Sequence, residues 1–161
     1  MSGKLSRKAQ KVQDELRRLG FSHRVVESQR TTRSAADAAQ AVGCTIGQIA
    51  KSLVFRSKST DRPILVIASG PNRVSEEKIA SYCSEPVEMA SADFVRERTG
   101  FAIGGVPPVG HAEPMETYID EDLLRHDEIW AAAGSPNAIF RLPPGDLIRM
   151  TGGRVVRVKG P

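Results

Sequence analysis

The pattern of hydrophobic and polar positions predicts a series of short helices and short strands. Apolar residues near the N-terminus recur at steps of four and three residues, through Leu5, Ala9, Val12, Leu16 and Leu19. This stripe predicts an amphipathic helix that ends at Gly20. Residues 23–27 (HRVVE) alternate weakly and predict a strand. Ser34, followed three residues later by Asp37, predicts the start of a second helix that ends at Gly43.

The middle of the chain predicts a buried hairpin. Thr45 and Gln48 have the spacing of a capping box for a single helical turn, which leads into a strand over residues 51–57 (KSLVFRS). A polar turn separates it from residues 63–69 (PILVIAS), whose nearly continuous apolar character is typical of a central strand. Ser75 and Gly100 mark the start and end of two further short helices. Later segments predict strands at 86–90, 115–120, 128–134, 137–142 and 154–159, and a helix at 145–150.

These elements indicate the fold class. Strands outnumber the long helices and do not follow a regular βαβ rhythm. We therefore expect an α+β domain, with a mixed, largely antiparallel β-sheet flanked by helices. No repeat, low-complexity tract or linker divides the chain, so residues 1–161 are expected to form a single domain.

Composition narrows the possible classes of protein. An apolar content of 40% and a charged content of 26% are ordinary for a soluble globular protein. The net charge of +4 favours an anionic partner, although a solvated basic face is the more common cause of such a surplus. The two cysteines lie far apart and the three histidines are scattered, so we expect no disulfide framework, no metal and no cofactor. The N-terminus resembles no signal peptide and no apolar run could span a membrane, which predicts a cytoplasmic protein.

Lys51 is the first residue that suggests chemistry. It heads a strand whose alternation places Leu53 and Phe55 on the same face. A lysine at the rim of such a face can direct its ammonium into a cavity, or it can merely bury its stem and reach water.

The Gly- and Pro-rich residues 104–111 (GGVPPVGH) are the second candidate. Gly104 and Gly105 allow close approach of a ligand to the backbone, while Pro107 and Pro108 stiffen the loop. Such a loop can offer N–H groups to an oxyanion or a phosphate, or it can simply connect core elements. The acidic residues 120–122 are interpreted as a helix start with a solvated face.

Four ordered segments resemble the YbaK/prolyl-tRNA-editing superfamily of aminoacyl-tRNA deacylases. They are IAKSLVF, PILVIASGPNRV, TGFAIGGVPPVGH and AAGSPNAIFRLPPGDL, and together they cover the chain from about Ser34 to the C-terminal strand. The resemblance implies a free-standing editing domain that acts in trans and removes a wrong, small amino acid from a tRNA, with a proline tRNA as the expected carrier. It implies that Lys51 is the catalytic residue. The substrate-binding residues implied are Gly104, Gly105, Pro108, His111, Ser135 and Asn137.

The implied mechanism needs little covalent assistance. An aminoacyl-tRNA is an activated ester with a free ribose hydroxyl beside it, so positioning and oxyanion stabilisation suffice, with a water or that hydroxyl attacking. Lys51 can act as an ammonium or, if it loses its proton, as a base; the charged role is favoured. Backbone N–H groups of Gly104 and Gly105 would face the ester carbonyl.

Partners and alternatives remain open at this point. The partner implied is the aminoacylated 3′ end of tRNA; prolyl-tRNA synthetase or an elongation factor is a further candidate, and the protein is expected to be a monomer or a homodimer. Basic residues near the C-terminus are candidates for phosphate contacts or form a solvated face; they are Arg149, Arg154, Arg157 and Lys159. The alternative functions are a non-catalytic tRNA- or synthetase-binding module of the same fold and a protein that binds an amino-acid derivative.

Overall fold

The computed structural model describes residues 4–161, so the first three residues of the N-terminal segment considered above lie outside it. The helices are α1 (Arg7–Arg18), α2 (Ala35–Val42), α3 (Glu76–Cys83), α4 (Ala92–Thr99) and α5 (Pro144–Thr151), with 3-10 turns η1 (Ile46–Gln48) and η2 (Glu121–Arg125). The strands are β1 (Val25–Glu27), β2 (Ile49–Ser57), β3 (Pro63–Ser69), β4 (Val87–Met89), β5 (Glu116–Asp120), β6 (Ile129–Ala132), β7 (Ala138–Leu142) and β8 (Arg154–Val156).

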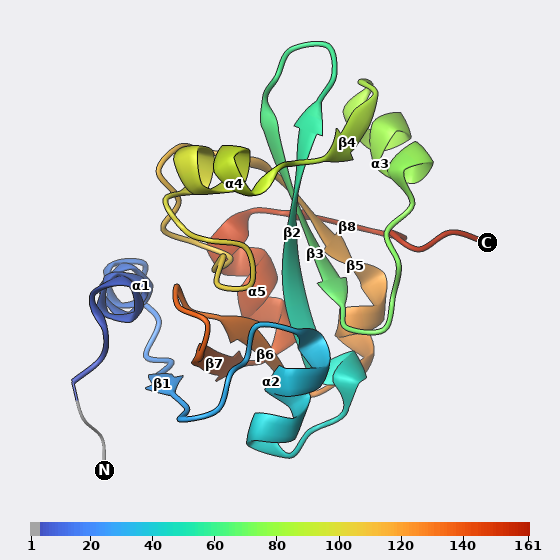
Figure 1. Ribbon diagram of the computed structural model, residues 1–161. Coiled ribbons are helices and arrows are strands. Elements are labelled where there is room, and N and C mark those ends of the chain that lie inside the picture. Colours follow the sequence, from blue (N-terminus) through green and yellow to red (C-terminus); the bar gives the residue numbers. More distant parts are fainter. Residues whose placement is uncertain (1–3) are drawn as a thin grey trace.

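The strands form one mixed sheet in the order β1-β7-β6-β2-β3-β5-β8, with β4 added to β2. The β1–β7, β6–β7, β2–β3 and β2–β4 pairs are antiparallel, whereas the β2–β6, β3–β5 and β5–β8 pairs are parallel. Figure 1 shows β2 and β3 running through the middle of the molecule as a long hairpin, with helices on either side. The predicted α+β class and mixed sheet are confirmed.

Local sequence signals place the helix ends. The Ser34 hydroxyl accepts a hydrogen bond from the Asp37 N–H at 3.0 Å, and Gly43 ends α2 in the left-handed conformation. Thr45 and Gln48 form the predicted capping box, in which the Thr45 N–H donates to the Gln48 side chain at 3.0 Å. These caps fix the chain on both sides of η1 and so determine where β2 begins.

One edge of β2 is interrupted. The parallel ladder with β6 ends at Ala50, and the antiparallel ladder with β4 begins only at Phe55. The other edge of β2 pairs with β3 without a break from Ala50 to Arg56. The backbone between the two ladders therefore has an open edge in the centre of an otherwise continuous sheet.

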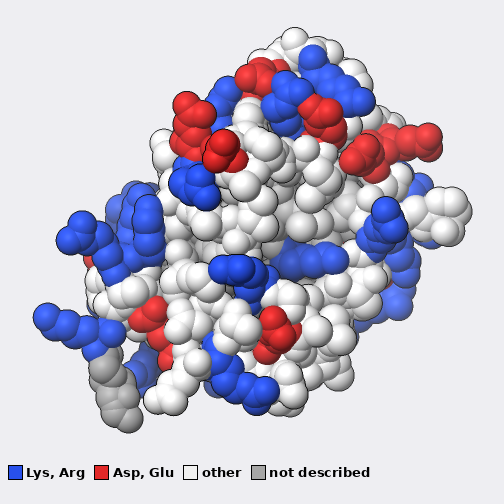
Figure 2. Space-filling model, in the orientation of Figure 1, with Lys and Arg blue, Asp and Glu red and all other residues white. Residues whose placement is uncertain are grey.

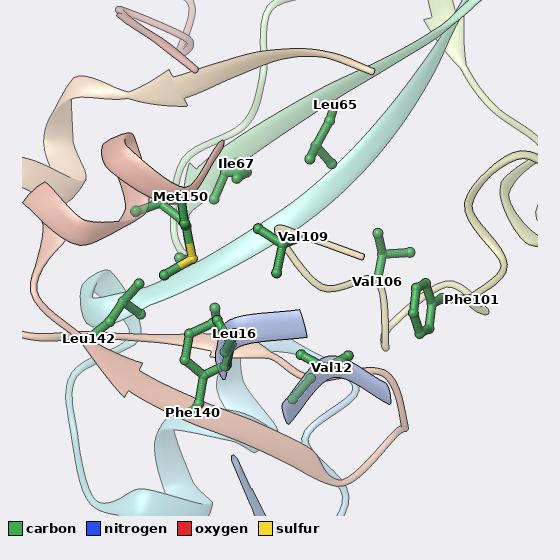
Figure 3. Close-up of a cluster of buried hydrophobic side chains, with 14 of the residues drawn as sticks. Val12, Leu16, Leu65, Ile67, Phe101, Val106, Val109, Phe140, Leu142 and Met150 are labelled. Atoms are coloured by element: carbon green, nitrogen blue, oxygen red, sulfur yellow. The ribbon is translucent and has the colours of Figure 1, made fainter. Parts of the chain in front are cut away.

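A hydrophobic core lies between α1, β7 and the segment that follows α4. Figure 3 shows Val12 and Leu16 from α1 facing Phe140, with Val106 and Val109 from the Gly/Pro-rich segment close to them. All five side chains are buried. Residues 101–115 form neither helix nor strand, but these two valines anchor the segment in the core.

The acidic residues 120–122 differ from their prediction. Asp120 does cap a helical turn, but Asp120 and Asp122 are buried rather than solvated. The Asp120 carboxylate accepts hydrogen bonds from the Ser69 N–H at 2.9 Å and from the Asn72 side chain at 2.8 Å. Partners from a distant turn thus replace water around these charges, and this is why the solvated interpretation is wrong.

Among the described helices, none is both long and apolar enough to cross a membrane. The same residues contain no cluster of His, Cys, Asp or Glu suited to a metal ion, and both cysteines are free thiols.

Candidate functional site

A pocket of about 390 Å³ opens beside the interrupted edge of β2. Its size is within the usual range for a site that binds a small ligand. Most of the residues that line it come from four regions: Thr32–Ala35 before and within α2, Ile49–Leu53 of β2, Ile103, Gly104 and Val106 of the Gly/Pro-rich segment, and Trp130–Ala132 of β6. Ala38, Gly70 and Ile139 complete the lining. The pocket therefore forms where the sheet leaves β2 unpaired and the segment after α4 covers the gap.

The backbone of Ser52 faces this gap. The Ser69 N–H points away from β2 toward β5, because it donates to Asp120. On the far side of the gap, the Ala90 N–H donates to the Val54 carbonyl oxygen. Because backbone groups alternate along a strand, the Ser52 N–H and C=O point to the same open edge as those of Val54. Ser52 thus presents a backbone N–H to the pocket, on the edge of β2 where no described strand pairs with this residue.

Lys51 lines the pocket and is half-buried. Burial lowers the pKa of its ammonium below the ordinary 10.5, and the negative charge of Asp120 partly opposes that effect. Leu53 and Phe55 lie in or against a second core cluster, as the alternation of the strand predicts. Lys51 is therefore held by a rigid strand, lines the pocket and is not part of the core clusters.

The direction of this pKa shift gives a test of the charge state of Lys51. If the site hydrolyses an ester, as the resemblance implies, and the ammonium is the active form, the rate should decline as the pH rises through a pKa that lies below 10.5. Lys51→Arg should remove this decline between pH 7 and pH 10, because a guanidinium stays charged there. The measurement is the single-turnover rate as a function of pH, with the spontaneous hydrolysis of the ester subtracted. A wild-type rate that rises through the same range would instead assign Lys51 the role of a base.

Gly104 lies where the Gly/Pro-rich segment meets Arg33 in the wall of the pocket. Its φ of +90° is in the left-handed region that favours glycine, and a Cβ there would overlap the Arg33 side chain. Arg33 is exposed, and it also lines the pocket. The glycine therefore allows the arginine stem to cross the loop at the mouth of the pocket.

The structure corrects the expectation for Gly105. Its N–H donates to the Ala102 carbonyl oxygen at 2.9 Å, so it is not free to face an ester carbonyl. Gly105 does not line the pocket, because it lies behind the wall and its Cβ position is 3.2 Å from the Ser135 backbone. Its φ is also outside the left-handed region, unlike that of Gly104.

The other predicted substrate-binding residues also lie behind the wall. Pro108 is buried, and the His111 ring nitrogen lies 2.6 Å from the Pro107 carbonyl oxygen, with burial lowering the His111 pKa. The Asn137 side chain donates to the Ser28 carbonyl oxygen at 2.7 Å and accepts from the Ser135 hydroxyl at 3.0 Å. None of these side chains lines the pocket. In this structure they hold the loop and the 134–137 turn in place.

The pocket is electropositive. Within the described residues, its walls include two cationic side chains, Lys51 and Arg33, and no carboxylate. Ser34 and Ala35 add the N-terminal end of α2, where backbone N–H groups and the helix dipole favour an anion. Figure 2 shows Lys and Arg side chains over α1 and across the centre of this face, whereas Asp and Glu gather mainly toward the top. An anionic or carbonyl-bearing ligand fits this electrostatic environment.

The basic residues near the C-terminus lie elsewhere. Arg154 begins β8, three strands from β2 in the sheet order, and its guanidinium lies 5.4 Å from the centre of the Tyr82 ring. Lys159 pairs with Asp122 at 3.2 Å, and Arg149 pairs with Asp146. Internal partners thus occupy several of these side chains, which favours a structural role for them over contact with a ligand in the pocket.

Three of the pocket residues that the sequence did not reveal matter most for its chemistry. Arg33 precedes the cap of α2, Trp130 lies in β6, and Ser52 follows Lys51. Their sequence context is that of an ordinary loop and two ordinary strands. The adjacency of Ser52 to Lys51 was the only available signal, because the open edge depends on which distant strands pair with β2.

Comparison with known proteins gives a consistent set of relatives. The protein-family model described as "Aminoacyl-tRNA editing domain" matches residues 29–150 of this chain. A crystal structure described as that of a "putative trans-editing enzyme for prolyl tRNA synthetase" superposes with a TM-score of 0.92 and 46% identity, covering 98% of this chain and 100% of its own. YwhH of Bacillus subtilis, which is uncharacterized, is 35% identical over 76% of this chain and 78% of its own length. EbsC of Enterococcus faecalis, named a "Putative Cys-tRNA(Pro)/Cys-tRNA(Cys) deacylase", is 26% identical over 78% of this chain and 76% of its own.

Proposed function

Because the chain belongs to the aminoacyl-tRNA editing domain family, we propose that it is a trans-acting deacylase that hydrolyses a small, wrongly attached amino acid from a tRNA, with proline tRNA as the first candidate. The observation that carries the proposal is the pocket beside β2, which combines two cations, the N-terminal end of α2 and the open edge of β2, with no carboxylate among the described residues that line it. Relatives described as editing enzymes for prolyl-tRNA synthetase or as deacylases of Cys-tRNA support the choice of substrate class.

The pocket has groups suited to each part of an aminoacylated 3′ end. The Arg33 guanidinium and the N-terminal end of α2 would receive the terminal phosphate. Trp130, half-buried at the rim, offers a flat surface on which the terminal adenine could stack. The ester would then lie near Lys51 and the open edge of β2.

Hydrolysis in this pocket would rest on positioning and on charge. The Lys51 ammonium and the Ser52 N–H would stabilise the oxyanion that forms when the ester carbonyl is attacked. Within the described residues, no Cys, His, Asp or Glu lines the pocket to serve as a nucleophile or a base. A water would therefore attack the ester carbonyl, the free ribose hydroxyl beside the ester would take up and relay its proton, and the ribose oxygen would leave with a proton. The reaction yields the free amino acid and uncharged tRNA.

Correctly charged Pro-tRNA should be spared for a steric reason. The wall opposite β2 is anchored in the core through Val106 and Val109, so it cannot yield easily to a bulky ring. Forcing extra atoms into a well-packed site costs about 1–3 kcal/mol. A pocket of this kind rejects a larger group more readily than a smaller one.

A panel of charged proline tRNAs tests the proposal. We expect alanine, serine or cysteine to be released at least tenfold faster than proline, because the stiff wall excludes the proline ring. The measurement is the loss of radiolabelled amino acid from each tRNA under single-turnover conditions. Hydrolysis of Pro-tRNA as fast as that of the mischarged forms would contradict an editing role.

The main alternative is a module of the same fold that binds tRNA or a synthetase without catalysis. It predicts retention of every aminoacyl group in the panel, together with binding of the charged tRNA. A protein that binds a free amino-acid derivative would instead show no affinity for the tRNA. Its affinity for that derivative would not depend on the salt concentration.

A further inference from the structure

A small recess opens off the pocket toward β4 and α4. Ser52, Leu53, Ile103 and Val106 line both spaces, so the two adjoin. The recess has a volume of about 30 Å³. One water molecule needs roughly 10–15 Å³ of space that is open to a water-sized sphere. The recess therefore has room for only one or two heavy atoms beyond the main pocket.

The walls of the recess are apolar except at Ser52. The remaining wall is formed by Val54, Met89, Ala90 and Val95. The Ser52 hydroxyl oxygen is buried and has no hydrogen-bond partner within the described residues. A buried hydroxyl without a partner is unfavourable, and native structures usually pair such groups. The partner that this hydroxyl lacks can therefore come from a ligand.

The recess lies beside the groups that would hold the ester. Ser52 belongs to both sites, since its N–H faces the open edge of β2 while its side chain lies on the face of β2 with Ala50 and Val54. An ester carbonyl held at Lys51 and the Ser52 N–H would place the amino acid Cα near the entrance of the recess. The side chain attached to that Cα is then the natural occupant.

We propose that this recess receives the side chain of the aminoacyl group and that Ser52 is a specificity-determining residue that favours serine over alanine. This inference rests on the proposed deacylase function. A hydroxymethyl group adds one polar atom beyond Cβ, and two hydroxyl groups can donate to and accept from each other. Alanine fits the recess but leaves the Ser52 hydroxyl unpaired. The thiol of cysteine is a weaker donor and acceptor, and threonine requires room for a further methyl group.

The test compares kcat/KM for proline tRNA charged with serine and with alanine. Wild-type protein should prefer serine by about tenfold, because a site with a polar partner discriminates against a substrate that lacks the matching group. Ser52→Ala should bring the ratio of the kcat/KM values for serine and alanine close to unity. Ser81→Ala, on the exposed face of α3, makes the same change away from both cavities and should preserve the wild-type ratio.

A second variant tests the effect of the shape of the recess separately from the effect of the Ser52 hydroxyl. Ala90→Val should narrow the recess while leaving Ser52 intact, and it should slow the release of serine more than that of alanine. An unchanged melting transition shows that each variant is folded. If the wild type releases neither amino acid, the proposed function fails. If it releases both and Ser52→Ala leaves their ratio unchanged, the assignment of Ser52 is overturned while the deacylase function stands.

Discussion

Lys51→Ala is expected to slow the release of alanine or serine from mischarged proline tRNA at least tenfold. The ammonium is one of two cations in the pocket, and it is held at the open edge of β2 where the ester would lie. A tenfold loss corresponds to about 1.4 kcal/mol of transition-state stabilisation, which is modest for a charged group in a half-buried site. The measurement is the single-turnover rate at saturating protein.

The fold should survive this substitution. Lys51 lies outside the three buried core clusters, and its removal eliminates the cost of keeping a charge half-buried. The melting transition should therefore stay at or above that of the wild type. Lys58→Ala, in the exposed turn of the same hairpin, is the matched control and should keep full activity. A Lys51→Ala protein with wild-type rates would remove the lysine from the mechanism.

Gly104→Val is expected to cause a loss of activity of similar size by a different route. At a φ of +90° a β-branched residue is strained, at a cost of about 1–3 kcal/mol. The new side chain would also displace Arg33 from the mouth of the pocket. We expect both a lower melting temperature and at least a tenfold lower rate of deacylation, measured as for the lysine variant.

Gly152→Val separates the effect of backbone strain from the effect of displacing Arg33. Gly152 ends α5 with a φ of +66°, and a Cβ there meets nothing within 4 Å among the described residues. This variant should share the backbone strain and the lower melting temperature, yet it should deacylate as fast as the wild type. Equal rates for Gly104→Val and the wild type would mean that the loop only connects core elements.

Local features of the fold were readable from the sequence because their causes are local. Ser34 caps α2 and Gly43 ends it through contacts within a few residues, so spacing alone identifies both ends. The face of β2 on which Lys51 lies follows in the same way from the alternation of the strand, although β2 begins two residues before Lys51, at Ile49. Its importance, however, was inferred from the resemblance to an editing family, because a lysine at a strand end has no unique meaning.

Features that depend on distant partners were not readable. The open edge of β2 exists because β6 pairs with one end of the strand and β4 with the other, and these segments come later in the chain. For the same reason the burial of Asp120 was missed, since its partners Ser69 and Asn72 lie about fifty residues away. The Gly/Pro-rich segment was identified, but only the structure shows that the Gly105 N–H is used within its own turn.

The most direct test of the account is to map the binding of a non-hydrolysable substrate mimic. Adenosine 5′-monophosphate that carries serine through a 3′-amide would be titrated into ¹⁵N-labelled protein, and the amide chemical shifts would be followed. The account predicts the largest changes at the backbone amides of Ser52 and Gly104 and at the Trp130 indole, with saturation at a single affinity. Changes confined to another surface, such as the outer face of α1, with no response at Ser52 and Gly104, would contradict it.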